Sequence, residues 1–248
     1  MLQNFESLVL IWLGVGFIAF ITLLKIPAPY GKFSKTNWGP MIPSKLGWIV
    51  MEIISPLALL YFFLNGNIVK TPTNITFVSL WTLHYLNRSV IYPLSQNNPA
   101  QMPLIIAMLA FLFNVMNGYI NGTYFGSIQQ YSAEYMSNWN FIVGVCLFII
   151  GAYINIKSDN ILLSLRSESG EYKIPQGFLF RYVSFPNYLG EILEWMAFAI
   201  MTWSLAGLSF MIWTMANLVP RAIKGHQWYH SKFESYPKKR KAIFPFII

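Results

Sequence analysis

Long apolar runs, separated by polar segments, are the feature of this sequence that most limits its fold. A helix needs about 17–20 consecutive apolar residues to cross the hydrocarbon core of a bilayer. Runs that approach or exceed this length occupy residues 8–24, 47–64, 77–94, 103–120, 141–156 and 188–219. Only 10% of the residues are charged, whereas a soluble domain has about 25%. The sequence therefore predicts an all-α fold, a polytopic membrane bundle.

The last run is too long for a single span. Residues 188–219 would form a helix of about 48 Å against a hydrocarbon core of about 30 Å, and Gly207 marks a break that would give two spans. With seven spans and the N-terminus outside, every Lys and Arg except Lys70 lies on the cytoplasmic side. Because cytoplasmic loops carry an excess of basic residues, we predict seven transmembrane helices with a cytoplasmic C-terminus.

No internal repeat or Gly/Ser-rich linker divides the chain, so we treat residues 1–248 as one domain. The first apolar run has no basic segment before it and is interpreted as a retained span. The protein is expected to be integral to a membrane, either the bacterial cytoplasmic membrane or the endoplasmic reticulum, in contact with lipid.

A stripe of polar residues opens the last apolar run. Asn187, Glu191, Glu194 and Trp195 are three or four residues apart, so a helix would place them on one side. Ionisable groups at membrane depth are costly and mark a site or a pathway by default. A polar stripe inside a bundle therefore needs partners or a ligand.

Three further polar residues, Glu52, Tyr85 and Arg88, lie inside apolar runs. Glu52 is either a structural hydrogen-bonding group or the acid of a site, and its position alone does not separate these two interpretations. For His84, which precedes Tyr85, we favour a histidine whose hydrogen bonds are satisfied within the bundle.

Polar residues also gather at the cytoplasmic ends of the last spans. Asn155 and Asp159 are four residues apart, and Arg166 follows. They are either ordinary helix-end groups or ligands, with Asp159 on a ribose hydroxyl and Arg166 on a phosphate. The segment 221–229 adds cations, hydrogen-bonding groups and aromatic rings on the same side. This combination suits an anionic ligand that carries hydroxyl groups.

Several other kinds of site are not indicated. A G-x-G-x-x-A pattern at residues 14–19 lies inside the first span with no strand before it, so it is not interpreted as a dinucleotide-binding turn. The histidines and the single Cys146 lack metal-ligand spacing, and no metal is expected. The net charge of +8 is mostly a topology signal, so nucleic acid is not an expected partner.

A set of short segments occurs in one characteristic order. It comprises N-I-K-S-D (155–159), Y-K-I-P-Q-G (172–177), N-Y-L-G-E-I-L-E-W (187–195), H-Q-W-Y (226–229) and K-F-E-S-Y-P-K-K-R-K (232–241), with Glu52, L-H-Y-L-N-R (83–88) and N-G-Y (117–119) upstream. With these segments the chain resembles the steroid 5α-reductase family (3-oxo-5α-steroid 4-dehydrogenases), as a bacterial-type homologue. It departs from the family pattern at Met51, where relatives tend to have Gln, and at Lys173 and Gly225.

The resemblance implies a seven-helix bundle that binds NADPH without a Rossmann fold and reduces the double bond of an enone. Residues of about 1–125 would bind the substrate, and residues of about 139–248 would bind NADPH. A 3-oxo-Δ4-steroid would accept hydride at C5 and a proton at C4, while Glu52 and Tyr85 donate hydrogen bonds to its C3 oxygen. The implied substrate-binding residues are Glu52, Tyr85, Arg88 and Asn117. The implied NADPH-binding residues are Asn155, Asp159, Arg166, Tyr172, Asn187, Glu191, Trp195, Arg221, His226 and Tyr229.

Three alternatives remain open at this stage. The substrate could be another sterol, a polyprenol or an enoyl lipid. The chain could belong to the membrane isoprenylcysteine methyltransferases, which share a similar C-terminal region and use S-adenosylmethionine. It could also be a non-catalytic lipid-binding protein or a transporter, although no mirrored half of the chain supports a transporter. The sequence implies no obligate protein partner.

Overall fold

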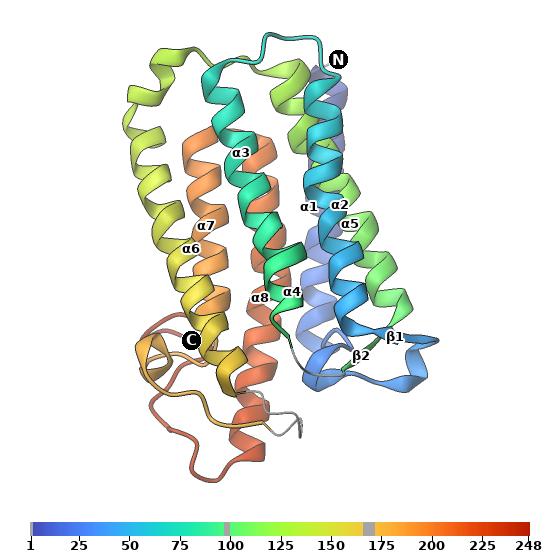
Figure 1. Cartoon of the computed structure of the whole chain (residues 1–248), viewed down its shortest axis with the longest axis vertical. Helices are drawn as coiled ribbons and strands as arrows, with labels where there is room; N and C mark the ends of the chain where they lie inside the picture. The colour runs from blue at the N-terminus through green and yellow to red at the C-terminus, as the bar shows by residue number, and fades with distance from the viewer. Residues whose placement is uncertain (1, 97–99, 166–171) are drawn as a thin grey trace.

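The computed structural model describes residues 2–96, 100–165 and 172–248, which fold into a bundle of long helices (Figure 1). The predicted helical bundle is confirmed. The long helices are α1 (Leu2–Lys25), α2 (Ser44–Leu64), α3 (Pro72–Leu86), α5 (Leu104–Thr123), α6 (Trp139–Leu165), α7 (Pro186–Thr202) and α8 (Leu205–Lys232).

Short elements join or extend these helices. A π-helical turn, Asn87–Ile91, joins α3 to the three-residue α4 (Tyr92–Leu94), and a second π-helical turn, Tyr124–Ile128, extends α5. The strands β1 (Met41–Pro43) and β2 (Gln101–Pro103) pair antiparallel. This two-stranded sheet was not part of the all-α prediction, because three-residue strands are too short to show a periodic pattern in the sequence.

Among the described residues, four helical stretches are long and apolar enough to cross a membrane, judged by length and composition. They are Leu2–Lys25, Ser44–Leu64, Leu104–Ile128 and Trp139–Leu165. The helices α3 and α7 are shorter, with 15 and 17 residues, and α7 also carries two of the nine acidic side chains. The amino-acid composition of the helices therefore supports a membrane protein.

The last apolar run divides at Trp203 and not at Gly207. Trp203 ends α7 in the left-handed region, with φ of 47° and ψ of 44°. Ser204 then caps α8, because its hydroxyl oxygen accepts a hydrogen bond from the Gly207 backbone N–H at 3.0 Å. Gly207 consequently lies in the first turn of α8, where its missing side chain leaves room for Thr202.

Glycines allow α6 and α7 to pack backbone against backbone. A Cβ atom on Gly151 would lie 2.7 Å from the Glu194 backbone nitrogen, and one on Gly190 would lie 2.5 Å from that of Asn155. No side chain fits at these points. The close approach therefore places the polar residues of α6 directly beside those of α7.

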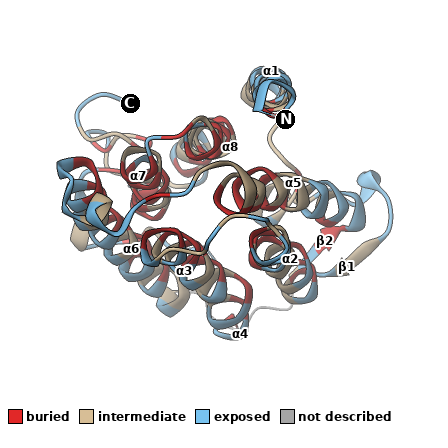
Figure 2. Ribbon diagram, turned by 90° about the horizontal axis from the view of Figure 1, so that it is seen from above, coloured by how far each residue is buried: buried red, intermediate tan, exposed pale blue. Residues whose placement is uncertain are grey.

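Helix α1 stands at one edge of the bundle (Figure 2). Its main attachment is to α8, where the Trp213 indole N–H donates to the Trp12 carbonyl at 3.1 Å and the two rings lie 4.5 Å apart. The Trp12 indole N–H in turn donates to the Asn117 side-chain oxygen at 3.1 Å. Because α1 is held chiefly along this line of contact, the space between α1, α5 and α8 is left for a cavity.

Candidate active site

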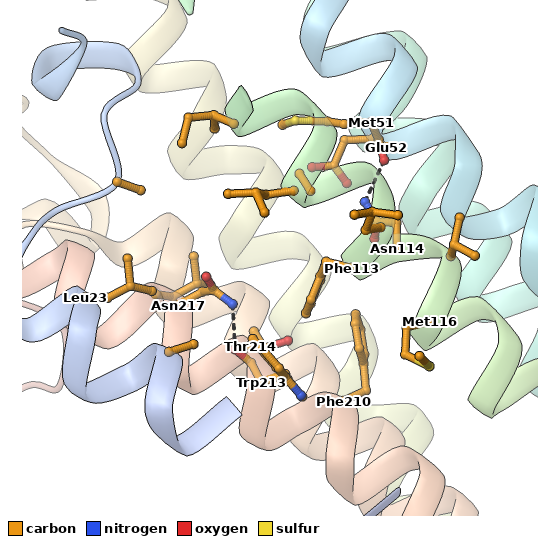
Figure 3. A pocket seen from close by; sticks show the side chains of 18 of the residues that line it. Leu23, Met51, Glu52, Phe113, Asn114, Met116, Phe210, Trp213, Thr214 and Asn217 are labelled. Carbon is orange, nitrogen blue, oxygen red and sulfur yellow. Dashed lines mark hydrogen bonds between the residues drawn. The ribbon is translucent and has the colours of Figure 1, made fainter. Parts of the chain in front are cut away.

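A cavity of about 1120 Å³ lies among α1, α2, α5 and α8 (Figure 3). Its lining extends along α1 from Leu8 to Leu23, which corresponds to about 22 Å of helix. Most lining side chains are aliphatic or aromatic, so the cavity suits a long apolar ligand. Four polar residues that the sequence singled out also line it, namely Glu52, Tyr85, Arg88 and Glu191.

Glu52 enters the cavity from α2, across from Asn114 on α5 (Figure 3). One turn further along α2 is Pro56, which has no N–H to donate to the Glu52 carbonyl. The backbone of α2 is therefore weakened at the turn that carries this carboxyl group.

Tyr85 faces the same cavity from α3. Its ring lies 5.6 Å from that of Trp81, 6.0 Å from that of Trp195 and 5.2 Å from that of His84. Its hydroxyl donates a hydrogen bond to the Asn114 side-chain oxygen at 3.3 Å. The ring packing fixes the phenol oxygen, while the proton points toward α5.

Arg88 joins three helices through a partly buried cluster of charges. It lies in the π-helical turn after α3 and donates to an Asp159 oxygen on α6 at 3.1 Å. A second guanidinium nitrogen lies 3.9 Å from a Glu191 oxygen on α7. The other Asp159 oxygen accepts a hydrogen bond from the Asn187 amide at 2.9 Å. Residues that are far apart in the sequence thus form one polar wall beside the apolar cavity.

Asn155 and Asn187 meet where α6 and α7 pack most closely. The Asn155 amide donates to the Asn187 carbonyl at 3.0 Å. The Asn187 side-chain oxygen and the Ser158 hydroxyl have no hydrogen-bond partner among the described residues. Buried polar atoms without a partner are uncommon in native proteins, so a ligand or water that supplies hydrogen bonds fits here.

Glu194 has a different partner from Glu191. A Glu194 oxygen lies 2.8 Å from the His84 ring nitrogen, and both side chains are almost fully buried. His84 is therefore a satisfied bundle histidine, as the sequence favoured, and Glu194 braces α7 against α3. The second Glu194 oxygen has no partner among the described residues.

Arg221 holds the segment between α1 and α2. Its guanidinium donates to the Tyr188 hydroxyl at 3.0 Å and to the carbonyls of Ala28 and Tyr30 at 3.4 Å and 3.2 Å. It also lies 3.5 Å from the centre of the Tyr30 ring. Burial raises the pKa of Tyr30 to about 12, although the nearby guanidinium opposes that shift. This arginine thus holds in place Ala28 and Tyr30, which line the cavity.

The C-terminal part of α8 carries His226 and Tyr229, and Tyr172 packs against it. A His226 ring nitrogen lies 2.6 Å from the Ser184 hydroxyl. Burial, aided by neighbouring cationic groups, lowers the pKa of His226 to about 4, so this ring is neutral at pH 7. The Lys32 ammonium lies 4.3 Å from the centre of the Tyr229 ring, and the Tyr172 ring is 5.0 Å from that of Trp228.

Three of the predicted site residues, Asn117, Trp195 and Arg166, are not among those that line the cavity in the described part of the chain. Asn117 does not line the cavity, because its side chain is turned to the Trp12 indole. Trp195 is enclosed by other rings and also lies outside the lining. Arg166 falls outside the described residues. Conversely, Asn114 lines the cavity but was not predicted from the sequence. Like Asn117, it is an amide within an apolar run, and this pattern could have identified it.

Comparison with known proteins decides the family. Residues 100–248 match the model of the 3-oxo-5-alpha-steroid 4-dehydrogenase family. A steroid 5-alpha-reductase from Solanum lycopersicum is 42% identical over 98% of this chain and 96% of its own length. The 3-oxo-5-alpha-steroid 4-dehydrogenase 1 of Rattus norvegicus is 37% identical over 94% of this chain and 92% of its own length.

The chain belongs to the steroid 5α-reductase family. The family model covers α5 to α8, and hence the polar wall built on Asp159 and Glu191. Glu52 and Tyr85 precede the matched stretch, but the similarity to the reductases of tomato and rat extends over nearly the whole chain. The family resemblance seen in the sequence is thereby confirmed.

Proposed function

We propose that this protein uses NADPH to reduce the Δ4 double bond of a 3-oxo-steroid. The observation that carries the proposal is the meeting of Glu52 and Tyr85 in one long apolar cavity, beside the polar wall of α6 and α7. A steroid is long, rigid and mostly apolar, and its C3 ketone needs hydrogen-bond donors. The relatives' names, which specify steroid reductases, support the same activity.

In the proposed reaction, C5 of the steroid accepts a hydride, the C4–C5 π electrons shift toward the ketone, and C4 accepts a proton. Negative charge develops on the C3 oxygen as the enolate forms. Glu52 in its protonated form and Tyr85 donate hydrogen bonds to that oxygen. Because donors aimed at developing charge stabilise the transition state more than the ground state, these two residues would lower the barrier. Arg88 lines the same cavity and would neutralise part of the charge.

The polar wall fits a dinucleotide. When bound, NADPH supplies the hydride that C5 accepts. The unpartnered Asn187 oxygen and Ser158 hydroxyl would hydrogen-bond to an amide or hydroxyl group of the ligand. Glu191, which lines the cavity, would orient the nicotinamide carboxamide or a ribose hydroxyl. The further proposed binding residues are Asn155, Asp159, Arg166, Tyr172, Trp195, Arg221, His226 and Tyr229.

Among those residues the two arginines are the proposed phosphate contacts, since a guanidinium offers two parallel donors to a phosphate. Trp195 would act indirectly, by packing against the residues around the site. Its ring lies 4.6 Å from that of His84. Asn117 would act on the substrate through α1, since its partner Trp12 lines the cavity.

We further propose that all seven long helices span the membrane, with the N-terminus outside and the C-terminus in the cytoplasm. The distribution of Lys and Arg supports this topology. The first half, about residues 1–125, would hold the steroid, and about 139–248 would hold NADPH from the cytoplasmic side. The host membrane would be the bacterial cytoplasmic membrane or the endoplasmic reticulum.

The activity is tested with purified membranes, NADPH and a panel of enones that includes testosterone and progesterone. We expect oxidation of NADPH that depends on a 3-oxo-Δ4-steroid and a product two mass units heavier. The stereochemistry at C5 is read directly from the isolated product. Membranes that contain the folded protein but reduce no 3-oxo-Δ4-steroid would contradict the proposed substrate, and reduction of another enone in the panel would replace it.

Glu191→Ala should weaken NADPH binding by about tenfold, because charge-assisted hydrogen bonds contribute roughly 1.5–3 kcal/mol each. The measurement is a fluorescence titration of the purified protein with NADPH. Glu134→Ala, which removes an exposed carboxylate far along the chain from α7, is the matched control and should bind normally. An unchanged titration for Glu191→Ala would make this carboxylate a structural partner of Arg88 only.

A further inference from the structure

Asn114 is a buried amide in the wall of the cavity, and both ends of its side chain are engaged. It is 2% exposed. Its amide nitrogen donates to the Met51 carbonyl at 2.6 Å (Figure 3), and its oxygen accepts from the Tyr85 hydroxyl at 3.3 Å. Helix α5 thus contacts, through one side chain, both the residue before Glu52 and the phenol of Tyr85.

The Met51 carbonyl fixes which way the amide points. A backbone carbonyl only accepts hydrogen bonds, so the NH₂ group of Asn114 must face it. The Asn114 oxygen is then left to face Tyr85. The Asn114 oxygen can only accept a hydrogen bond, so Tyr85 must be the donor.

Asn114 therefore supplies an acceptor for the Tyr85 proton, and the Ser55 hydroxyl is a second hydrogen-bonding neighbour of the phenol. The phenol oxygen is held in place by rings on α3 and α7, so the remaining freedom is rotation of the O–H bond. Asn114 and Tyr85 both line the cavity, and a hydrogen bond between them keeps the proton on the cavity side. At 3.3 Å the bond is longer than the usual 2.7–2.8 Å of an O–H···O hydrogen bond. A closer acceptor, such as a ketone oxygen, would readily share or take the proton.

We propose that Asn114 is a positioning residue for the reduction of the ketosteroid: it holds the Tyr85 proton on the cavity side, from which a short rotation of the O–H bond brings the proton to the C3 oxygen. This inference rests on the proposed function. The Met51 carbonyl holds the amide in the required orientation, so the Tyr85 proton starts close to the substrate oxygen. A donor that is already held near its acceptor needs little reorganisation at the moment of reaction.

The test uses Asn114→Leu, which keeps the size of the side chain and removes both hydrogen bonds, with Asn114→Ala as a second variant in case leucine does not fit. We expect kcat for a 3-oxo-Δ4-steroid to fall about tenfold, with KM changed less than about threefold. Asn121→Leu is the matched control, since Asn121 is a buried amide on the same helix, seven residues on, and does not line the cavity. It should retain wild-type kcat.

A double-mutant cycle with Tyr85→Phe separates positioning from a general loss of structure. If Asn114 acts through the Tyr85 hydroxyl, adding Asn114→Leu to the Tyr85→Phe variant should lower kcat by less than about twofold. An equal tenfold loss in both backgrounds would overturn the proposal, because the effect would then be independent of Tyr85.

An absorbance measurement without turnover gives an independent readout. Binding of testosterone should shift the enone absorption band to longer wavelength, since a donor polarises the ketone. The shift should shrink in Asn114→Leu and persist in Asn121→Leu. Wild-type protein that shows the shift but does not reduce the steroid would refute the proposed function and leave Asn114 to be judged by the shift. An equal shift in wild type and Asn114→Leu would overturn the role of Asn114.

Discussion

Removing the carboxyl group of Glu52 should have the largest effect on turnover of any single change in the cavity. We expect Glu52→Leu to lower kcat for a 3-oxo-Δ4-steroid by about 10²–10³-fold, the usual cost of losing one donor to a developing oxyanion. Glu52→Gln should lose at least about tenfold, because an amide N–H is a weaker donor than a carboxylic acid. Initial rates of NADPH oxidation in membranes with matched protein levels measure both losses.

Two controls test whether the loss of turnover is specific to the role of Glu52 in the reaction. NADPH affinity should be unchanged in both Glu52 variants, since none of the proposed cofactor residues belongs to α2. Glu6→Gln, which alters an exposed carboxylate of α1, should leave the rate unchanged. A Glu52→Leu variant that turns over at the wild-type rate would show that Glu52 is a structural group, the other interpretation that its position in the sequence allowed.

The sequence predicted the helices and the residues of the cavity better than it predicted their pairings. Hydrophobicity and spacing locate Glu52, Tyr85, Arg88 and Glu191, and all four line one cavity. The partnership of Arg88 with Asp159 joins positions 71 residues apart. No local period carries such information, because it depends on which helices become neighbours after the chain has folded.

Two details of the structure show what the local sequence pattern does not determine. Asn114 and Asn117 are three residues apart on α5 and therefore only about 60° apart around the helix axis. That difference turns one side chain to Tyr85 and the other to Trp12. The helix break was predicted at Gly207, because glycine often interrupts a helix, but the chain turns at Trp203, a non-glycine residue in a left-handed conformation.

Breaking the charge cluster around Arg88 should have the largest effect on stability. We expect Arg88→Leu to lower the free energy of unfolding by about 3–5 kcal/mol, because it leaves the buried Asp159 and the partly buried Glu191 without their cation. For a chain of this size the loss corresponds to a fall in Tm of about 10 °C. Heating the detergent-solubilised protein and measuring the fraction that remains monodisperse gives the comparison. Arg181→Leu, at an exposed position, is the control and should melt like the wild type.

A second variant distinguishes unpaired charge from lost packing as the cause of the reduced stability. If unpaired carboxylates cause the damage, adding Asp159→Asn to Arg88→Leu should recover part of the lost stability, since the second change removes one of the stranded charges. If Arg88 instead stabilises mainly through the rings of Trp48 and Tyr92, which lie 5.4 Å and 4.9 Å from its guanidinium, the double variant should be no more stable than Arg88→Leu. Recovery of stability in the double variant would show that ion pairing in this cluster holds α6 and α7 to the turn after α3, beside the cavity.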